Sequence, residues 1–310
     1  MSLAGKVAVV TGSGAGLGLA YAQELARQGA AVIINDVSQD AADAAVASIT
    51  DAGGKAAAVV APVGSSETAQ QLVDSAVETF GGLDILVTNA GILRDKSLLK
   101  MTDDDFDAVI NVHLRGTFTC VRAAYAYFKE NGVAGRIVCI GSPTGQRGNF
   151  GQTNYAAAKA GIVGMVQTWA MEMKKAGVAV NAVIPVAATA MTKTVPFFQK
   201  AVEADERGEA MPEFYRRELG FGPAQDVAGV IAFLSSDEAA GVSGQVVGVG
   251  GDRLQVWSHP EAVVQEYHEG GWDYQTMLTE GRSILEGNVQ SVGEKFPELP
   301  AELQPEAPAK

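Results

Sequence analysis

Short apolar runs alternate with amphipathic stretches over roughly the first 250 residues, and this alternation restricts the chain to one class of fold. The runs are rich in β-branched residues, as expected for strands that are buried on both faces of a sheet. We expect strands at 7–11, 31–35, 56–63, 85–88, 136–140, 179–184 and 245–249. The stretches between them have helical spacing, with two long helices at about 104–129 and 154–176. The predicted fold class is therefore α/β, with a single, doubly wound, parallel seven-stranded sheet and helices on both faces.

Two parts of the chain depart from this alternation. The connection at about 191–220 is longer and more charged than a simple link requires. No linker occurs before residue 250, so we expect one domain at 1–252 and a C-terminal extension at 253–310. Four of the eleven prolines lie between Pro297 and Pro308, and we expect about the last 15 residues to be disordered.

Charge and cysteine content exclude several classes of protein. The chain has 23 Lys and Arg against 36 Asp and Glu, a net charge of −13, which argues against nucleic acid or an anionic membrane surface as a partner. Cys120 and Cys139 lie in apolar runs without a CxxC pair, and the three histidines are scattered, so we expect no disulfide and no metal site. We find neither a signal peptide nor an apolar stretch near the ~20 residues of a membrane span, and expect a cytoplasmic protein.

A glycine-rich loop follows the first predicted strand. Thr11 is followed by Gly-Ser-Gly-Ala-Gly-Leu-Gly, which leads into the first helix. A pyrophosphate requires backbone N–H groups and a helix N-terminus without interfering Cβ atoms, and Gly12, Gly16, Leu17 and Gly18 are placed to provide them. We therefore expect a dinucleotide site at this turn.

Asp36 ends the second predicted strand, 18 residues after Gly18. A carboxylate there can accept hydrogen bonds from the adenosine ribose hydroxyls and repels a 2′-phosphate. No Lys or Arg occurs at 13–15 or 37–38 to bind that phosphate, so NAD is expected and NADP is less favoured.

Tyr155 and Lys159 lie four residues apart on one predicted helix and therefore share a face. An ammonium group and an oxidised nicotinamide near a phenol favour the phenolate, so we expect a lowered tyrosine pKa and a usable base. Ser142 ends the fifth strand, at the sheet edge where open α/β folds bind ligands.

These motifs, together with Asn89-Ala90-Gly91 and Asn111, resemble the short-chain dehydrogenase/reductase family over roughly residues 5–252. The resemblance implies a Rossmann-type fold and hydride transfer between a substrate carbon and nicotinamide. It implies that Tyr155 is the general acid/base, that Lys159 binds the nicotinamide ribose and lowers the tyrosine pKa, that Ser142 positions the substrate oxygen, and that Asn111 holds a water of the proton relay. The implied cofactor contacts are Gly12, Gly16, Leu17, Gly18, Asp36, Val63, Asn89, Ala90, Gly91, Tyr155, Lys159, Pro185 and Thr189.

The chain departs from the family pattern at three points. Pro62 stands before Val63 where the family often has Asp, so we expect Val63 to act through its backbone alone. Val186 follows Pro185 where Gly is usual, and Thr88 precedes Asn89 where Asn is common. None of these changes removes a group to which the resemblance assigns catalysis.

Three further stretches, around Arg94, His113 and Pro185–Thr192, are similar to the dehydrogenase part of peroxisomal multifunctional enzymes. This similarity implies oxidation of (3R)-3-hydroxyacyl-CoA. The alternatives are a bacterial 3-oxoacyl-carrier-protein reductase, a 17β-hydroxysteroid dehydrogenase, or, in a different class, a non-catalytic dinucleotide sensor.

The family places its substrate lid at the 191–220 connection, where Met191, Val195, Pro196, Phe197 and Phe198 are candidates for an apolar wall. Arg216 and Arg217 are candidates for a CoA phosphate, although charges in so mixed a run are usually solvated. His113 is interpreted as a core or interface residue. The two long helices resemble those that pair across a two-fold axis in the family, so a homodimer or homotetramer is expected.

Overall fold

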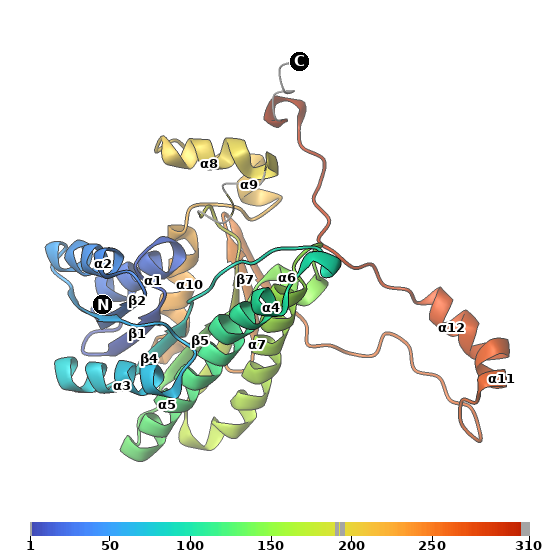
Figure 1. The fold of residues 1–310 in the computed structure, drawn as a ribbon, viewed down its shortest axis with the longest axis horizontal. Helices are drawn as coiled ribbons and strands as arrows, with labels where there is room; N and C mark the ends of the chain where they lie inside the picture. The colour runs from blue at the N-terminus through green and yellow to red at the C-terminus, as the bar shows by residue number, and fades with distance from the viewer. Residues whose placement is uncertain (1, 190–191, 193–195, 305–310) are drawn as a thin grey trace.

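The computed structural model describes residues 2–189, 192 and 196–304, and its centre is one eight-stranded sheet (Figure 1). The strand order is β3-β2-β1-β4-β5-β6-β7-β8, and every pairing is parallel except that of β7 with β8. The strands are β1 (Val7–Thr11), β2 (Ala31–Asp36), β3 (Lys55–Val60), β4 (Ile85–Thr88), β5 (Arg136–Ile140), β6 (Ala179–Pro185), β7 (Val246–Gly250) and β8 (Arg253–Val256).

The predicted doubly wound parallel sheet is confirmed, but the predicted number of strands was one short. The boundary expected at residue 252 falls in the turn between β7 and β8, so the first residues of the extension add an antiparallel edge strand. The strand was missed because four residues with mixed polarity and one open face carry no clear alternation.

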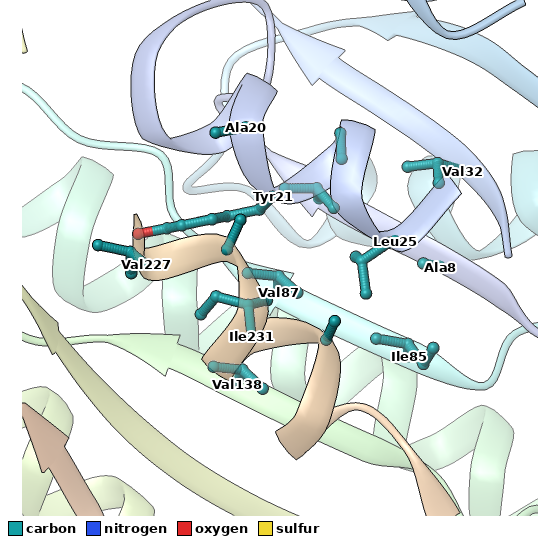
Figure 2. Close-up of a cluster of buried hydrophobic side chains, with 14 of the residues drawn as sticks. Ala8, Ala20, Tyr21, Leu25, Val32, Ile85, Val87, Val138, Val227 and Ile231 are labelled. Atoms are coloured by element: carbon teal, nitrogen blue, oxygen red, sulfur yellow. The ribbon is translucent and has the colours of Figure 1, made fainter. Parts of the chain in front are cut away.

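Helices cover both faces of the sheet. The helices of the main body are α1 (Gly16–Arg27), α2 (Gln39–Asp51), α3 (Ser66–Phe80), α4 (Asp103–Val109), α5 (Gly116–Asn131), α6 (Pro143–Arg147), α7 (Thr153–Glu172) and α10 (Gln225–Leu234). On one face, Tyr21 and Leu25 of α1 pack with Val227 and Ile231 of α10 over the central strands (Figure 2). On the other face, α3, α5 and α7 bury a second core around Phe128.

The helix expected at about 104–129 is interrupted. A π-helical segment, η2 (Ile110–Arg115), separates α4 from α5. Such a segment inserts an extra residue into the helix and changes which side chains share a face. The other long helix follows the prediction more closely, with α7 and then the 3₁₀ turn η3 (Lys174–Ala176).

The region of the expected lid forms a small unit of its own above the sheet. It contains η4 (Pro196–Phe198), α8 (Gln199–Glu206) and α9 (Glu213–Arg217). Phe198, Tyr215 and Phe221 form its buried centre, and the rings of Phe198 and Phe221 stack with centroids 4.3 Å apart. Met191 and Val195, also expected in the apolar wall, lie outside the described residues.

The extension first leaves the body and then returns to it (Figure 1). We call residues 258–292 the arm; they include α11 (Tyr274–Thr276), the π-helical η6 (Met277–Gly281) and α12 (Arg282–Gly287). We call residues 293–304 the strap; they include η7 (Ala301–Leu303) and pack on the lid through Leu299 and Leu303. Part of the stretch expected to be disordered is therefore packed, and residues 305–310 lie outside the described residues.

No helix within the described ranges is both long and apolar enough to span a membrane.

Candidate active site

The glycine-rich loop after β1 is packed too closely against its neighbours for side chains. A Cβ on Gly12, which has a φ of 62°, would lie 2.6 Å from the Cα of Ala90. A Cβ on Gly18 would lie 2.2 Å from the carbonyl oxygen of Gly12. The loop therefore needs glycine at both positions, which leaves its backbone bare toward a ligand.

Helix α1 presents an uncapped N-terminus at the end of this loop. Its N-cap, Ala15, provides no side-chain hydrogen bond, and the first turn has no acidic residue, whereas α2 and α3 are capped by Ser38 and Ser65. The first hydrogen bond of this turn runs from Leu19 N to Ala15 O, at 3.2 Å. The N–H groups of residues 16–18 come before it and have no acceptor within the helix. Free N–H groups and the positive end of a helix dipole suit a pyrophosphate, so these residues fit the dinucleotide that the loop predicts.

Asn89 connects the loop to β4. Its Nδ2 donates to the carbonyls of Thr11 (3.1 Å) and Gly12 (2.9 Å), and the Thr11 hydroxyl accepts from the N–H groups of Asn89 and Ala90. The Asn89 side chain therefore holds the loop in place. Asn89 and Ala90 would therefore contact a dinucleotide through their backbones, next to the backbone of Gly91.

The Asp36 carboxylate lies at the carboxyl end of β2, beside the loop. One oxygen accepts from the Gly14 N–H at 3.0 Å and the other from the Ser38 N–H at 3.1 Å. Two backbone donors thus fix the carboxylate where the first two strands end, which is the position expected for an adenosine ribose.

Tyr155, Lys159 and Ser142 come together at the carboxyl end of β5. The Lys159 Nζ donates to the carbonyl of Ile140 at 2.6 Å and lies 5.6 Å from the centre of the Tyr155 ring. The Ser142 hydroxyl lies close enough to the Tyr155 phenol to lower the pKa of Tyr155. The structure therefore brings together three of the four side chains predicted to be catalytic.

Asn154 fixes the start of α7 next to this centre. Its buried Nδ2 donates to the carbonyls of Arg94 (3.2 Å) and Asp105 (3.0 Å), and its Oδ1 accepts from the Tyr155 N–H at 2.8 Å. Sequence analysis did not single out Asn154; the available signal was a polar residue directly before the tyrosine on an otherwise apolar helix face.

Burial is the largest cause of the pKa shifts of Lys159 and Tyr155. It lowers the pKa of Lys159 to about 7. It raises the pKa of Tyr155, although the nearby Ser142 hydroxyl acts in the opposite direction. Without a bound cofactor the desolvation of the phenol outweighs the other contributions, and the lowered pKa that we expect with an oxidised nicotinamide beside Tyr155 stays a prediction.

Asn111 is the fourth side chain predicted to be catalytic, and no hydrogen bond links its described side chain to the other three. It lies in η2 with an exposed side chain, and a Cβ on Gly64 would lie 2.7 Å from its Nδ2. His113 of the same π-helical segment contacts the centre instead: its ring lies edge-on to Tyr155, with centroids 5.2 Å apart. Sequence analysis interpreted His113 as a core or interface residue.

The other predicted cofactor contacts lie along the same edge of the sheet. The Val63 side chain is buried against Gly116, and the expected contact of its backbone with the cofactor stays a prediction. Pro185 ends β6, and the Thr189 N–H donates to the Thr192 hydroxyl at 2.8 Å. Among the described residues, no cluster of three or more His, Cys, Asp or Glu side chains could hold a metal ion.

The two arginines considered for a CoA phosphate already have partners. Arg216 pairs with Asp226 at 2.9 Å and with Asp252 at 2.6 Å, and Arg217 pairs with Glu213 at 2.8 Å. Arg216 joins α9 to α10 and to the turn after β7, so its contacts in the structure are those of a structural residue.

The lid is also held by the returning strap. The ring of Phe296 lies 5.0 Å from that of Phe197 and 5.9 Å from that of Phe198, and Lys200 Nζ donates to the carbonyl of Glu302 at 2.6 Å. The C-terminal strap therefore forms part of this aromatic unit, whose role as a substrate lid stays a prediction.

Comparison with known proteins gives consistent results. The family model described as short chain dehydrogenase matches residues 6–199. Hydroxyacyl-CoA dehydrogenase ChsB1 of Mycobacterium tuberculosis is 42% identical over 284 residues, which cover 87% of this chain and 86% of that protein. The 3-oxoacyl-[acyl-carrier-protein] reductase FabG of Thermotoga maritima is 41% identical over 254 residues, which cover 81% and 98%. The crystal structure of a short chain dehydrogenase from Mycobacterium avium superposes with a TM-score of 0.81 at 35% identity, covering 96% of this chain and 99% of that one.

Proposed function

Because this chain belongs to the short-chain dehydrogenase family, and is therefore an oxidoreductase of CH–OH groups that binds a nicotinamide dinucleotide, we propose that it oxidises (3R)-3-hydroxyacyl-CoA to 3-oxoacyl-CoA with NAD. The observation that carries the reaction type is the juxtaposition of Tyr155, Ser142 and Lys159 beside the dinucleotide loop. The substrate class rests on the 42% identity to a hydroxyacyl-CoA dehydrogenase over most of both chains.

The chemistry divides between the cofactor and the protein. When bound, the oxidised nicotinamide supplies the acceptor for the hydride that leaves the substrate carbon. We propose that the Ser142 hydroxyl holds the substrate oxygen and that Tyr155, as phenolate, takes the hydroxyl proton, so that C–H and O–H bonds break as C=O forms. Reduction is the reverse, with Tyr155 as the proton donor.

Lys159 has two tasks in this proposal. It binds the nicotinamide ribose, and its ammonium form favours the Tyr155 phenolate. Because burial raises the pKa of Tyr155 in the chain alone, we propose that the positive charge of the bound nicotinamide completes the activation. The base would then be active mainly when the cofactor is in place.

The preference for NAD is proposed from Asp36. Its carboxylate is fixed by the N–H groups of Gly14 and Ser38, so it cannot swing away from a 2′-phosphate without losing both hydrogen bonds. Titration of each dinucleotide by nicotinamide fluorescence tests this, and tighter binding of NADP would reject it.

A homodimer or homotetramer formed through α5 and α7, in the cytoplasm, remains our prediction for the assembly. Phe118 of α5 and Met171 of α7 are exposed in the single chain, which favours a partner on this face. Sedimentation at micromolar concentration tests it, and a monomer would contradict it.

The experiment for the activity is a panel in which reduction of NAD is followed with 3-hydroxyacyl-CoA esters of both configurations and several chain lengths, and with 17β-hydroxysteroids. Reduction of 3-oxoacyl-carrier protein with NADPH is measured in parallel, since FabG of Thermotoga maritima favours that alternative. We expect the (3R)-hydroxyacyl-CoA esters to give the highest kcat/KM. Binding of dinucleotide without turnover of any substrate would support the sensor alternative instead.

A further inference from the structure

His113 is a buried polar side chain that contacts the Tyr155 ring and has no role in the proposed mechanism. It is 2% exposed and is contributed by the π-helical segment η2, between α4 and α5. Its ring stands at 89° to that of Tyr155, in an edge-to-face contact. A Cβ on Gly91 would lie 2.3 Å from its Cε1, so the imidazole also packs directly on the loop after β4.

One nitrogen of the ring is held by backbone alone. His113 Nε2 lies 2.8 Å from the carbonyl oxygen of Ile92 and 3.0 Å from the N–H nitrogen of the same residue. A neutral imidazole nitrogen either donates or accepts, so Nε2 uses the carbonyl in one tautomer and the N–H in the other. Ile92 therefore accommodates both neutral tautomers.

The other nitrogen is free. Nδ1 is buried and has no hydrogen-bond partner among the described residues. A buried polar atom without a partner costs free energy, so its retention calls for a reason. Because Ile92 accepts both tautomers, Nδ1 can present either a lone pair or an N–H.

The ring is uncharged under the conditions of the reaction. Burial first, and then the positive charge of Lys159, lower the pKa of His113 to about 3. A neutral ring adds no positive charge to a centre that already contains Lys159 and would receive an oxidised nicotinamide. It can therefore orient its neighbours without opposing cofactor binding.

Building on the proposed function, we propose that His113 is a positioning residue for the proton-transfer step, which holds the Tyr155 ring against the Gly91–Ile92 loop and offers Nδ1 as a hydrogen-bond partner to the proton relay. This is the part that the family resemblance assigned to Asn111. The Asn111 side chain is exposed and lies near Gly64, whereas His113 contacts the tyrosine.

Two substitutions separate this part from packing. His113→Phe keeps a flat ring beside Tyr155 but removes both nitrogens, and we expect kcat to fall about 10- to 100-fold with KM within about threefold. His113→Asn restores a side chain that both donates and accepts, and should recover most of that loss. We also expect the solvent deuterium isotope effect on kcat to rise in His113→Phe, because proton transfer becomes rate-limiting.

Cys120→Ala provides the control for packing, since it opens a buried site on α5, the helix that follows η2, and removes no group to which the mechanism gives a role. It should lower the melting temperature without changing the isotope effect. Wild-type kcat in His113→Phe, an unchanged isotope effect, no recovery in His113→Asn, or a larger loss in Asn111→Ala would each overturn the proposal.

A measurement without turnover keeps the two proposals apart. In ¹⁵N-histidine-labelled protein, the Nδ1 resonance of His113, assigned with His113→Asn, should shift when the dinucleotide binds and the relay closes. An unchanged Nδ1 resonance would overturn the part given to His113, whatever substrate is used. Failure of every substrate in the panel together with a shifted Nδ1 would reject only the proposed function.

Discussion

The sheet edge that carries the candidate site and the arm of the extension hold their side chains in opposite ways. At the sheet edge, polar side chains are tied to backbone atoms of other segments: Lys159 to Ile140, Asn89 to Thr11 and Gly12. In the arm, every hydrogen bond of the described residues 260–292 stays within that stretch, and Tyr267, Tyr274 and Leu285 are exposed.

This difference indicates what each region can control. Backbone partners are set by the fold, so they position these side chains before a ligand arrives, and a changed side chain there should affect the chemistry. The arm makes few long-range contacts within its own chain, so a change there should leave the chemistry intact. The strap is intermediate, because it packs on the lid through Leu299 and Leu303, and the lid cluster does not include Tyr155, Ser142 or Lys159.

The largest effect should follow from Tyr155→Phe. The proton has no acceptor in this variant, and we expect kcat to fall by about 10²- to 10⁴-fold. The dinucleotide loop is unchanged, so binding of NAD, measured by fluorescence titration, should stay within about twofold. Substantial turnover in Tyr155→Phe would show that another group accepts the proton.

Lys159→Met should separate stability from activity. Lys159 has an ordinary pKa in the unfolded chain and about 7 in the folded one, so between pH 7 and 10 only the unfolded state holds its proton. Folding of the wild type is therefore disfavoured at and below pH 7, and this cost is relieved as the pH rises.

We expect Lys159→Met to lose activity yet to unfold at a higher temperature than the wild type at pH 7. The loss of the hydrogen bond to Ile140 should reduce this gain in the free energy of unfolding by about 1 kcal/mol. Between pH 7 and 10, the free energy of unfolding of the wild type should rise relative to that of the variant by up to about 1.4 kcal/mol per pH unit. Thermal and urea unfolding at both ends of this range check it, and a constant difference would contradict the lowered pKa.

Asp36→Ala should change the choice of cofactor. Loss of charge-assisted hydrogen bonds to the ribose should lower kcat/KM with NAD by about 10- to 100-fold and reduce the discrimination against NADP. Asp40→Ala, which removes an exposed carboxylate in the first turn of α2, is the matched control. Equal effects of the two substitutions would mean that general charge, not Asp36, selects the cofactor.

Most of the body could be predicted because its signals are local. Buried strands are continuous apolar runs, and the glycines at 12 and 18 are required by contacts that recur wherever a strand turns sharply into a phosphate-binding helix. The order of the parallel strands then follows from the crossover helices, and it brings Ser142, two residues after β5, near Tyr155 of α7.

The position of His113 beside Tyr155 and the path of the arm could not be predicted from the sequence, for different reasons. A π-helical segment inserts one residue, so helical spacing counted through 110–115 does not show which of Asn111 and His113 faces the site. The arm has no periodic apolar pattern that matches a surface of its own chain. The rise in the Tyr155 pKa also required the structure, because the extent of burial is not encoded in the spacing of Tyr155 and Lys159.

Phe296→Ala tests the intermediate region, the strap. Its ring pairs with Phe197 and Phe198, and an aromatic pair contributes about 0.5–1.5 kcal/mol, so the lid should be held less firmly. If the lid covers the substrate, KM should rise about three- to tenfold with little change in kcat. Leu285→Ala in the arm should leave both constants unchanged, and an effect on kcat in Phe296→Ala would show that the strap reaches the reacting groups.

The smallest effect should come from removing the arm. The residues on either side of the arm both contact Arg147: the Trp257 ring centroid lies 5.3 Å from the Arg147 guanidinium carbon, and the Gly293 N–H donates to the Arg147 carbonyl at 2.8 Å. A short Gly-Ser linker in place of residues 260–291 can therefore join β8 to the strap. Because residues 260–291 make no hydrogen bond to the described body, we expect NAD binding to be unchanged.

The melting temperature of this deletion variant should stay within about 2 °C of the wild type, measured at several protein concentrations. A larger fall at all concentrations would contradict the contrast drawn between the two regions, since the arm would then stabilise its own chain. A fall that grows with concentration would place the arm between copies, because only a contact between chains depends on mass action. The exposed Tyr274 and Leu285 would then be interface residues of the assembly. The body would stabilise its own chain, whereas the arm would stabilise a neighbouring copy.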